Sequence, residues 1–413
     1  MKGLHRRNRL ALVGLAAGAL LALGGAGCVG LQQYNQTPEE WVRELRDPET
    51  GATADLCIIE FDDEGEFWDV RQLRDTVALI QRRTQEFPRG LVVPVFIHGW
   101  KNNADWSREK GDLRRIAREV TRSAAHLQSR AATSHPERVV GVYIGWRGDV
   151  AKGRLSREAT FWNRLLAADR VASLNLKEAL YAVMHTTKMN PASKLVMYGH
   201  SMGGRVLFNA MSGALIKGTT ESGQAGTALP VDLVVLANPA NRAVDVARFV
   251  DLLKRYHLQL AVDGPDGQPK PCRGPLIASI TSEADTATKR AFPFGQGFVR
   301  LFRTYREDAP PGQPSQAWLA AHTDGHTDYL LSHRAAVVDG KVVLTEVPGR
   351  YNDTPYWVIR VTPEICASHG DLANPRLNEL VGQLLEMNET YTGKSRPHLT
   401  STPPPLRPSE PAH

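Results

Sequence analysis

The sequence predicts an α/β domain with a doubly wound, mostly parallel sheet. Short apolar runs alternate with longer segments of helical spacing along most of the 413 residues, which is typical of parallel strands joined by crossover helices. The runs are apolar at almost every position, as expected of strands that helices cover on both faces. Hydrophobic residues make up 42% of the chain and charged residues 23%, which excludes an intrinsically disordered protein.

The expected strands are apolar runs of five to seven residues. Runs of this length are short for helices, and they are rich in Val and Ile, which favour strands. In chain order they are Leu56–Phe61, Leu91–Ile97, Val139–Ile144, Lys194–Tyr198, Val231–Ala237, Leu276–Thr281 and Tyr356–Val361.

The segments between the strands carry apolar residues at helical spacing. Leu73, Val77 and Ile80 show this spacing in the first segment, which ends before Pro88 because proline disfavours a helical residue in front of it. The expected helices are Arg71–Gln85, Asp105–Arg130, a long helical region ending near Lys188, Met202–Ile216, Ala243–Tyr256 and Pro375–Met387.

Two segments depart from this alternation. Residues 286–350 contain Pro-Phe-Gly and Pro-Pro-Gly with several His and Asp residues, and we expect an insertion or lid before the last strand, with a hairpin around Ala335–Val347. The tail, residues 388–413, holds six of the 26 prolines and is expected to be disordered. Residues 54–387 are therefore expected to form the folded domain.

The N-terminus has the composition of an export signal. Residues 1–27 combine four basic residues with an uncharged run of mainly Gly, Ala and Leu, which is short for a permanent membrane span. Leu23–Cys28 resembles a bacterial lipobox, although Gly25 stands where an aliphatic residue is usual. The resemblance implies that Cys28 is lipidated and becomes the mature N-terminus.

The lipobox resemblance also implies a location. Val29 follows the cysteine, which implies a protein of the bacterial cell envelope, lipid-anchored in the outer membrane and facing the periplasm. Residues 28–53 are polar and are expected to form a tether with a short helix at Pro38–Arg46. A plain secreted protein and an uncleaved anchor are the alternatives.

The charge pattern argues against a nucleic-acid-binding protein. The net charge is +6, but residues 28–413 carry 46 basic and 44 acidic residues. They lack the concentrated basic surface that nucleic-acid binding requires. Cys57, Cys272 and Cys366 are enough for one disulfide, or they are small buried hydrophobic residues. None of them has metal-ligand spacing.

One motif carries nucleophilic chemistry. Residues 199–203 read Gly-His-Ser-Met-Gly, between an apolar strand and an amphipathic helix. A serine on a sharp strand-to-helix turn projects its hydroxyl, and the crowded turn admits only small residues two positions before and after it. The helix N-terminus adds free N–H donors for a developing oxyanion. Ser201 is therefore the predicted nucleophile.

A second motif precedes the serine by about 100 residues. The strand ending at Ile97 is followed by His98-Gly99-Trp100, and Gly-Trp-Arg-Gly-Asp occupies residues 145–149. With the serine motif, these residues resemble the α/β-hydrolase superfamily, and within it the bacterial lipase- and esterase-like serine hydrolases, over residues 54–387. The resemblance implies an α/β-hydrolase type of sheet, a small-molecule or lipid ester as substrate and no metal or organic cofactor. It also implies that the backbone N–H groups of Trp100 and Met202 hold the oxyanion.

The acid and the base are expected after the serine, as this type of fold requires. Asp285 lies just beyond the strand Leu276–Thr281 and is the expected acid, with Glu283 and Asp245 as rivals. His369 lies between the last strand and the last helix and is the expected base, with His326 as its rival.

Other readings of these residues remain open. His322, His326 and His333 with Asp324 and Asp328 are an alternative metal site, although we expect no metal. A non-catalytic envelope lipoprotein that uses the fold as a binding scaffold is the alternative from another functional class. An acyltransferase or amidase on the same triad is the enzymatic alternative.

Overall fold

The computed structural model describes most of the predicted domain. It covers residues 32–130, 137–151, 153–221, 227–228, 231–255, 258–263, 269–271, 274–293, 296, 304–305, 309, 312–348, 354–389 and 398–401. The expected signal segment 1–27, Cys28, Cys272 and most of the tail lie outside these residues.

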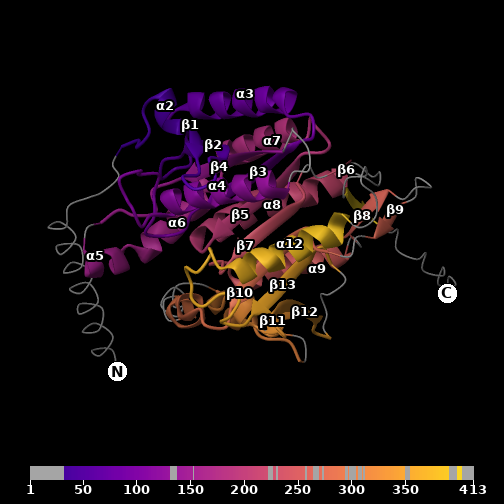
Figure 1. Ribbon diagram of the computed structural model, residues 1–413. Coiled ribbons are helices and arrows are strands. Elements are labelled where there is room, and N and C mark those ends of the chain that lie inside the picture. The colour runs from indigo at the N-terminus through magenta and orange to yellow at the C-terminus, as the bar shows by residue number, and fades with distance from the viewer. Residues whose placement is uncertain are drawn as a thin grey trace.

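A ten-stranded sheet runs through the molecule (Figure 1) in the order β1-β2-β4-β3-β5-β7-β10-β13-β11-β12. All neighbours from β2 to β11 are parallel, and only β1 and β12 at the two edges are antiparallel to their neighbours. The predicted α/β class with a mostly parallel sheet is confirmed. The strands are β1 Val42–Arg46, β2 Thr53–Glu60, β3 Leu91–Ile97, β4 Arg138–Gly145, β5 Lys194–His200, β7 Leu233–Ala237, β10 Ile277–Ser282, β11 His333–Val338, β12 Lys341–Glu346 and β13 Tyr356–Val361.

Helices cover both faces of this sheet. On β3, Val93 and Val95 face one hydrophobic core while Phe96 faces another, because successive strand residues point to opposite faces. Helices α3, α6, α7, α8 and α9 contribute to the first core, whereas α4 and α12 cover the opposite face. Their bounds are α3 Val70–Glu86, α4 Asp112–Arg130, α6 Phe161–Val171, α7 Leu174–Thr187, α8 Met202–Glu221, α9 Ala243–Arg255 and α12 Pro375–Glu389, and the shorter helices are α2 Pro38–Trp41, α5 Arg154–Ala159 and α11 Gln316–Ala321.

The described part of the expected tether belongs to the folded domain. Helix α2 ends at Trp41, and β1 then pairs antiparallel with β2, where a helix over Pro38–Arg46 was expected. Trp41 is fully buried and donates from Nε1 to Asp75 Oδ2 at 2.9 Å. The buried carboxylate of Glu60 accepts hydrogen bonds from the backbone N–H groups of Tyr34 and Asn35. The tether was predicted from the polar composition of residues 28–53. The described part of this segment is instead held on the domain by these long-range contacts.

Part of the expected insertion 286–350 also joins the main sheet. Strands β11 and β12 form the predicted hairpin, but β11 pairs in parallel with β13 and so extends the sheet. Ala335 on β11 is buried in the same core as α12. Exposed positions alternate with buried ones over the first three residues of both strands, as in a sheet edge with one covered face.

A second, four-stranded sheet was not predicted. It has the order β6-β14-β8-β9 and consists of β6 Thr227–Ala228, β8 Leu258–Asp263, β9 Pro269–Pro271 and β14 His398–Ser401. Strand β14 lies in the segment expected to be a disordered tail, and it pairs with both β6 and β8. The proline content that suggested disorder says nothing about pairing between segments so far apart in the chain.

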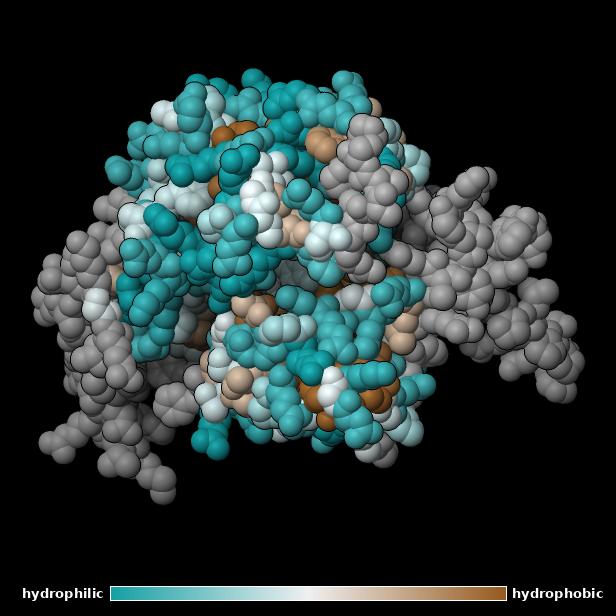
Figure 2. Space-filling view, viewed as in Figure 1, coloured by the Kyte–Doolittle hydropathy of each residue, from teal (hydrophilic) through white to brown (hydrophobic). Residues whose placement is uncertain are grey.

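The surface is mainly hydrophilic on the face that Figure 2 shows. Hydrophobic residues gather there in small groups, one of them over the region of the β11–β12 hairpin, where Val338 and Val343 are 50% and 42% exposed. Within the described ranges, no helix combines the length and the apolar character needed to cross a bilayer.

Candidate active site

Ser201 lies on a sharp turn between β5 and α8. Its φ of 55° is in the left-handed region, which is uncommon for a residue other than glycine. The Ser201 N–H donates to the Ala237 carbonyl at 3.0 Å, and the Ser201 carbonyl accepts from the Ala240 N–H at 3.0 Å. A Cβ on Gly203 would clash with the carbonyl oxygens of Ile97 and His98. The segments after β7 and β3 therefore hold the serine in this strained conformation.

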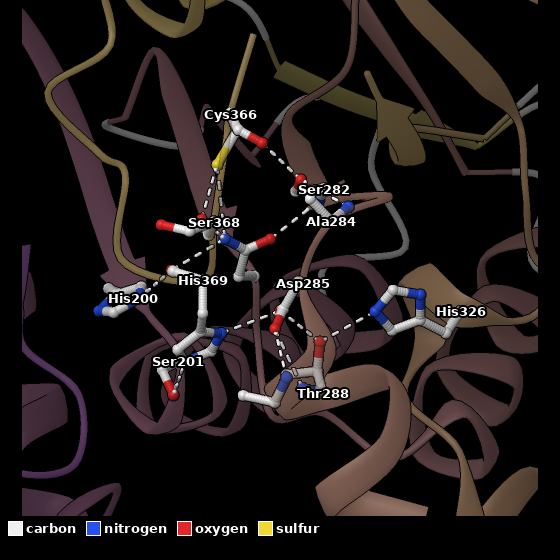
Figure 3. Close-up of polar contacts among 12 residues, drawn as sticks. His200, Ser201, Ser282, Ala284, Asp285, Thr288, His326, Cys366, Ser368 and His369 are labelled. Carbon is white, nitrogen blue, oxygen red and sulfur yellow. Dashed lines mark hydrogen bonds and ion pairs between the residues drawn. The ribbon is translucent and has the colours of Figure 1, made fainter. Parts of the chain in front are cut away.

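The structure brings the expected nucleophile, base and acid together (Figure 3). His369 Nε2 lies 2.9 Å from Ser201 Oγ, and His369 Nδ1 lies 2.9 Å from Asp285 Oδ2. Ser201 is 8% exposed and Asp285 fully buried, whereas the His369 side chain is 28% exposed. The imidazole is therefore the most exposed of the three side chains and connects a fully buried carboxylate with a hydroxyl that is only slightly exposed.

The Asp285 carboxylate accepts four hydrogen bonds. Oδ1 accepts from the backbone N–H groups of Ala287 at 2.9 Å and Thr288 at 3.1 Å, and Oδ2 accepts from the Thr288 hydroxyl and from His369. Burial works to raise the pKa of Asp285, but the hydrogen bonds from His369 and Thr288 and the proximity of the imidazole outweigh it and lower that pKa. Asp285 is thus held as an anion facing His369.

The rival acids point elsewhere. Glu283 forms an ion pair with Arg334 at 3.1 Å, and Asp245 forms one with Arg242 at 2.7 Å. Neither has a hydrogen bond to a histidine among the described residues.

The rival histidine and the alternative metal ligands are also placed differently from the triad. His326 lies on the side of Asp285 away from Ser201 (Figure 3) and contacts Thr288 Oγ1 at 3.0 Å. His322 donates to the Trp318 carbonyl, and the ring of His333 stacks on Trp357. Within the part of the chain that the structure describes, no three His, Cys, Asp or Glu side chains are grouped as a metal ion would need.

Asn238, which the sequence did not single out, and His200 of the serine turn fix the loop of His369. The His369 carbonyl accepts from Asn238 Nδ2 at 2.9 Å and from His200 Nε2 at 2.8 Å. His200 Nε2 must carry the proton because a carbonyl only accepts. Burial holds the pKa of His200 well below its usual value, so the ring is neutral. Asn238 follows β7 at the sheet edge that carries Ser201, and this position is the signal that could have found it.

A rigid support lies under the His98-Gly99-Trp100 loop. The His98 ring stacks with the rings of Tyr143 and Trp146, and its Nε2 accepts from the Trp146 backbone N–H at 3.0 Å. Trp146 Nε1 donates back to the His98 carbonyl at 2.8 Å. Burial lowers the pKa of His98 to about 4, so His98 is a neutral structural residue.

The two expected oxyanion donors lie beside the serine. A Cβ built on Gly99 would be 2.9 Å from Ser201 Cβ, so the residue after it, Trp100, begins next to the nucleophile. Met202 is the first residue of α8, and its N–H has no partner within the helix. Among the described residues, neither the Trp100 N–H nor the Met202 N–H donates to a backbone carbonyl in a turn or loop. The Trp100 side chain packs edge to face on Phe161.

The remaining sequence expectations concern cysteines. Cys57 and Cys366 are both buried and free, so they are not joined to each other.

Comparison with protein-family models, with curated proteins and with solved structures found no match to this chain.

Proposed function

We propose that this protein is a serine hydrolase of the α/β-hydrolase type that cleaves carboxylic esters through an acyl-enzyme. The observation that carries the proposal is the unbroken hydrogen-bond chain from Ser201 Oγ through His369 to Asp285, with the serine on a strained strand-to-helix turn. The triad residues also follow one another in the chain order Ser, Asp, His that this fold type requires.

The geometry supports the following sequence of proton transfers. His369 Nε2 accepts the Ser201 proton while the oxygen attacks the ester carbonyl carbon. Asp285 holds the imidazole by Nδ1 and stabilises the imidazolium that forms. The imidazolium then donates its proton to the departing alkoxide, which leaves an acyl-enzyme. Water, deprotonated by the same histidine, attacks the acyl carbon. The bond from the acyl carbon to Ser201 Oγ then breaks, His369 returns the proton to that oxygen, and the acid is released.

The charge on the carbonyl oxygen develops beside two backbone donors. The N–H groups of Trp100 and Met202 are the proposed oxyanion donors. Because His98 and Trp146 fix the loop of Trp100, and α8 fixes Met202, little reorganisation accompanies the reaction. Removing one such donor typically costs about 10²–10³-fold in kcat.

The experiment that tests this function is labelling by a fluorophosphonate, which reacts with activated serines, followed by hydrolysis of p-nitrophenyl esters of graded acyl length. We expect labelling of the wild-type protein at Ser201 and none of Ser201→Ala, which removes one oxygen from the turn and leaves the fold intact. Labelling without ester hydrolysis would favour an amidase or acyltransferase. A correctly folded wild-type protein that neither labels nor hydrolyses any ester would refute an enzymatic function.

The cellular location is a separate proposal. The lipobox-like segment ending at Cys28 supports an envelope lipoprotein that meets small-molecule or lipid esters from the membrane surface. Because the described chain from Tyr34 onward is already packed on the domain, the anchor would hold the domain close to the bilayer.

A further inference from the structure

The proposed triad continues beyond its acid. On the side of Asp285 away from His369, the Thr288 hydroxyl contacts Oδ2, and His326 Nε2 contacts that hydroxyl at 3.0 Å. Figure 3 shows Ser201, His369, Asp285, Thr288 and His326 in one line of polar contacts. Thr288 belongs to the single turn Ala287–Ala291, and His326 ends the short turn Asp324–His326.

The direction of each hydrogen bond in this line is fixed by the chemistry of its members. An ionised carboxylate only accepts, so the single Thr288 hydroxyl proton is donated to Asp285. The Thr288 oxygen must therefore accept from His326, whose proton is on Nε2. Burial lowers the pKa of His326 to about 4, so the ring is neutral at pH 7 and Nδ1 carries no proton.

His326 is itself held from both sides of its turn. Asp324 is buried and accepts from Ser279 Oγ at 2.7 Å and from Tyr356 Oη at 2.9 Å. Arg360 Nε donates to the Gly325 carbonyl at 3.1 Å. Strands β10 and β13 thus hold the backbone of the turn that ends at His326.

We propose that Thr288 and His326 are positioning residues that fix the Asp285 carboxylate for its hydrogen bond to His369. This inference rests on the proposed hydrolase function. The backbone N–H groups of Ala287 and Thr288 occupy Oδ1, and the Thr288 hydroxyl occupies one side of Oδ2. The only direction left on Oδ2 faces His369. His326 acts through Thr288, because its N–H keeps the hydroxyl rotor turned toward the carboxylate.

A double-mutant cycle tests this coupling. Thr288→Val removes the hydroxyl at equal volume and is expected to lower kcat about tenfold with KM unchanged. His326→Leu keeps the Thr288 hydroxyl but removes the N–H that donates to it, and is expected to lower kcat about threefold. The double variant should match Thr288→Val alone, because on this proposal His326 acts on the carboxylate through Thr288 and not through its own contact with the Asp285 backbone. Losses that multiply, or a Thr288→Val variant as fast as wild type, would overturn the proposal.

Conservative variants and a matched control separate positioning from general damage. Thr288→Ser keeps the hydroxyl, and His326→Gln keeps an N–H donor near the position of Nε2, so each should recover most of the loss. His333→Leu replaces a buried histidine that stacks on Trp357 and should not change kcat. A loss in His333→Leu equal to that in His326→Leu would mean that any buried histidine matters, which contradicts the proposal.

A measurement without substrate keeps this inference distinct from the proposed function. In a protein with ¹⁵N-labelled histidine, the NMR spectrum at neutral pH should show His326 protonated at Nε2 only, and Thr288→Val should shift that resonance. A proton on Nδ1 instead would overturn the proposal even in an active enzyme. If wild type hydrolyses no ester but the resonance behaves as expected, the contact stands and the hydrolase function fails.

Discussion

Replacing Asp324 with asparagine is expected to change how the stability of the protein depends on pH. Burial raises the pKa of Asp324 from 3.8 to about 6, although Ser279 and Tyr356 donate hydrogen bonds to its carboxylate. The folded protein therefore binds this proton more tightly than the unfolded chain does. Ionisation costs stability as the pH rises above 3.8, and the cost is complete above a pH of about 6.

The size of this effect follows from the two pKa values. Their difference corresponds to a free energy on the order of 3 kcal/mol, at about 1.4 kcal/mol per pKa unit. About 1 kcal/mol of it is already lost at about pH 4.5, and nearly all of it at about pH 7.5. Between these two conditions, the free energy of unfolding of the wild type should fall by about 2 kcal/mol relative to Asp324→Asn. Any constant cost of the new amide cancels in this comparison.

Urea-induced unfolding followed by tryptophan fluorescence at the two pH values measures this difference. Asp285→Asn is the matched control, because the pKa of Asp285 is lowered and not raised in the folded state. Its charge contributes stability that is present above the unfolded pKa and is lost as the pH falls. Both pH values lie above the unfolded pKa of 3.8, so the advantage of the wild type over Asp285→Asn should stay nearly constant between them, in contrast to Asp324→Asn. A constant difference between wild type and Asp324→Asn would refute the reasoning.

Three other predictions have direct readouts. His369→Ala is expected to lower kcat on the order of 10³-fold, because Ser201 then has no proton acceptor; a loss of only a few fold on a soluble ester would place the base elsewhere. Gly203→Ala is expected to lower the free energy of unfolding by roughly 1–3 kcal/mol, because its Cβ would clash with backbone at the end of β3. Gly213→Ala in the same helix meets open space and should show no such loss. Cys28→Ser is expected to abolish metabolic palmitate labelling and release the protein from membranes, and label that persists would contradict the lipid anchor.

The parallel sheet could be predicted from the sequence because its signal is local. A strand covered on both faces must be apolar throughout, and β3, β4, β5 and β13 each appear as such a run. The turn at Ser201 was found for the same reason, since small residues on either side of the serine are required by the turn itself.

The features that were missed depend on contacts between distant segments. Trp41 is buried because α2 packs beside α3, and no pattern within residues 28–53 reveals that neighbour. The sequence named Asp285 as the acid but left Glu283, two residues earlier, as a rival. The turn closed by the Asp285 N–H on the Ser282 carbonyl directs Asp285 inward, whereas Glu283 pairs with Arg334. The contact between Thr288 and His326 spans 38 residues.

The spacing of the triad is set by the sheet more than by the loops. Ser201 follows β5 and Asp285 follows β10, and β7 lies between these two strands. Alternate strands are roughly 10 Å apart, a gap that two hydrogen bonds of 2.9 Å and one imidazole ring can bridge. The middle strand supplies Asn238, which supports the ring's loop by the His369 carbonyl and also accepts from the Ser282 N–H through Oδ1. The histidine itself needs only to reach this gap, so it can lie 168 residues after the serine and 84 after the acid. The position of His369 is fixed by hydrogen bonds from Asn238 and His200 to its backbone carbonyl. These bonds do not depend on which side chains precede or follow His369 in the sequence.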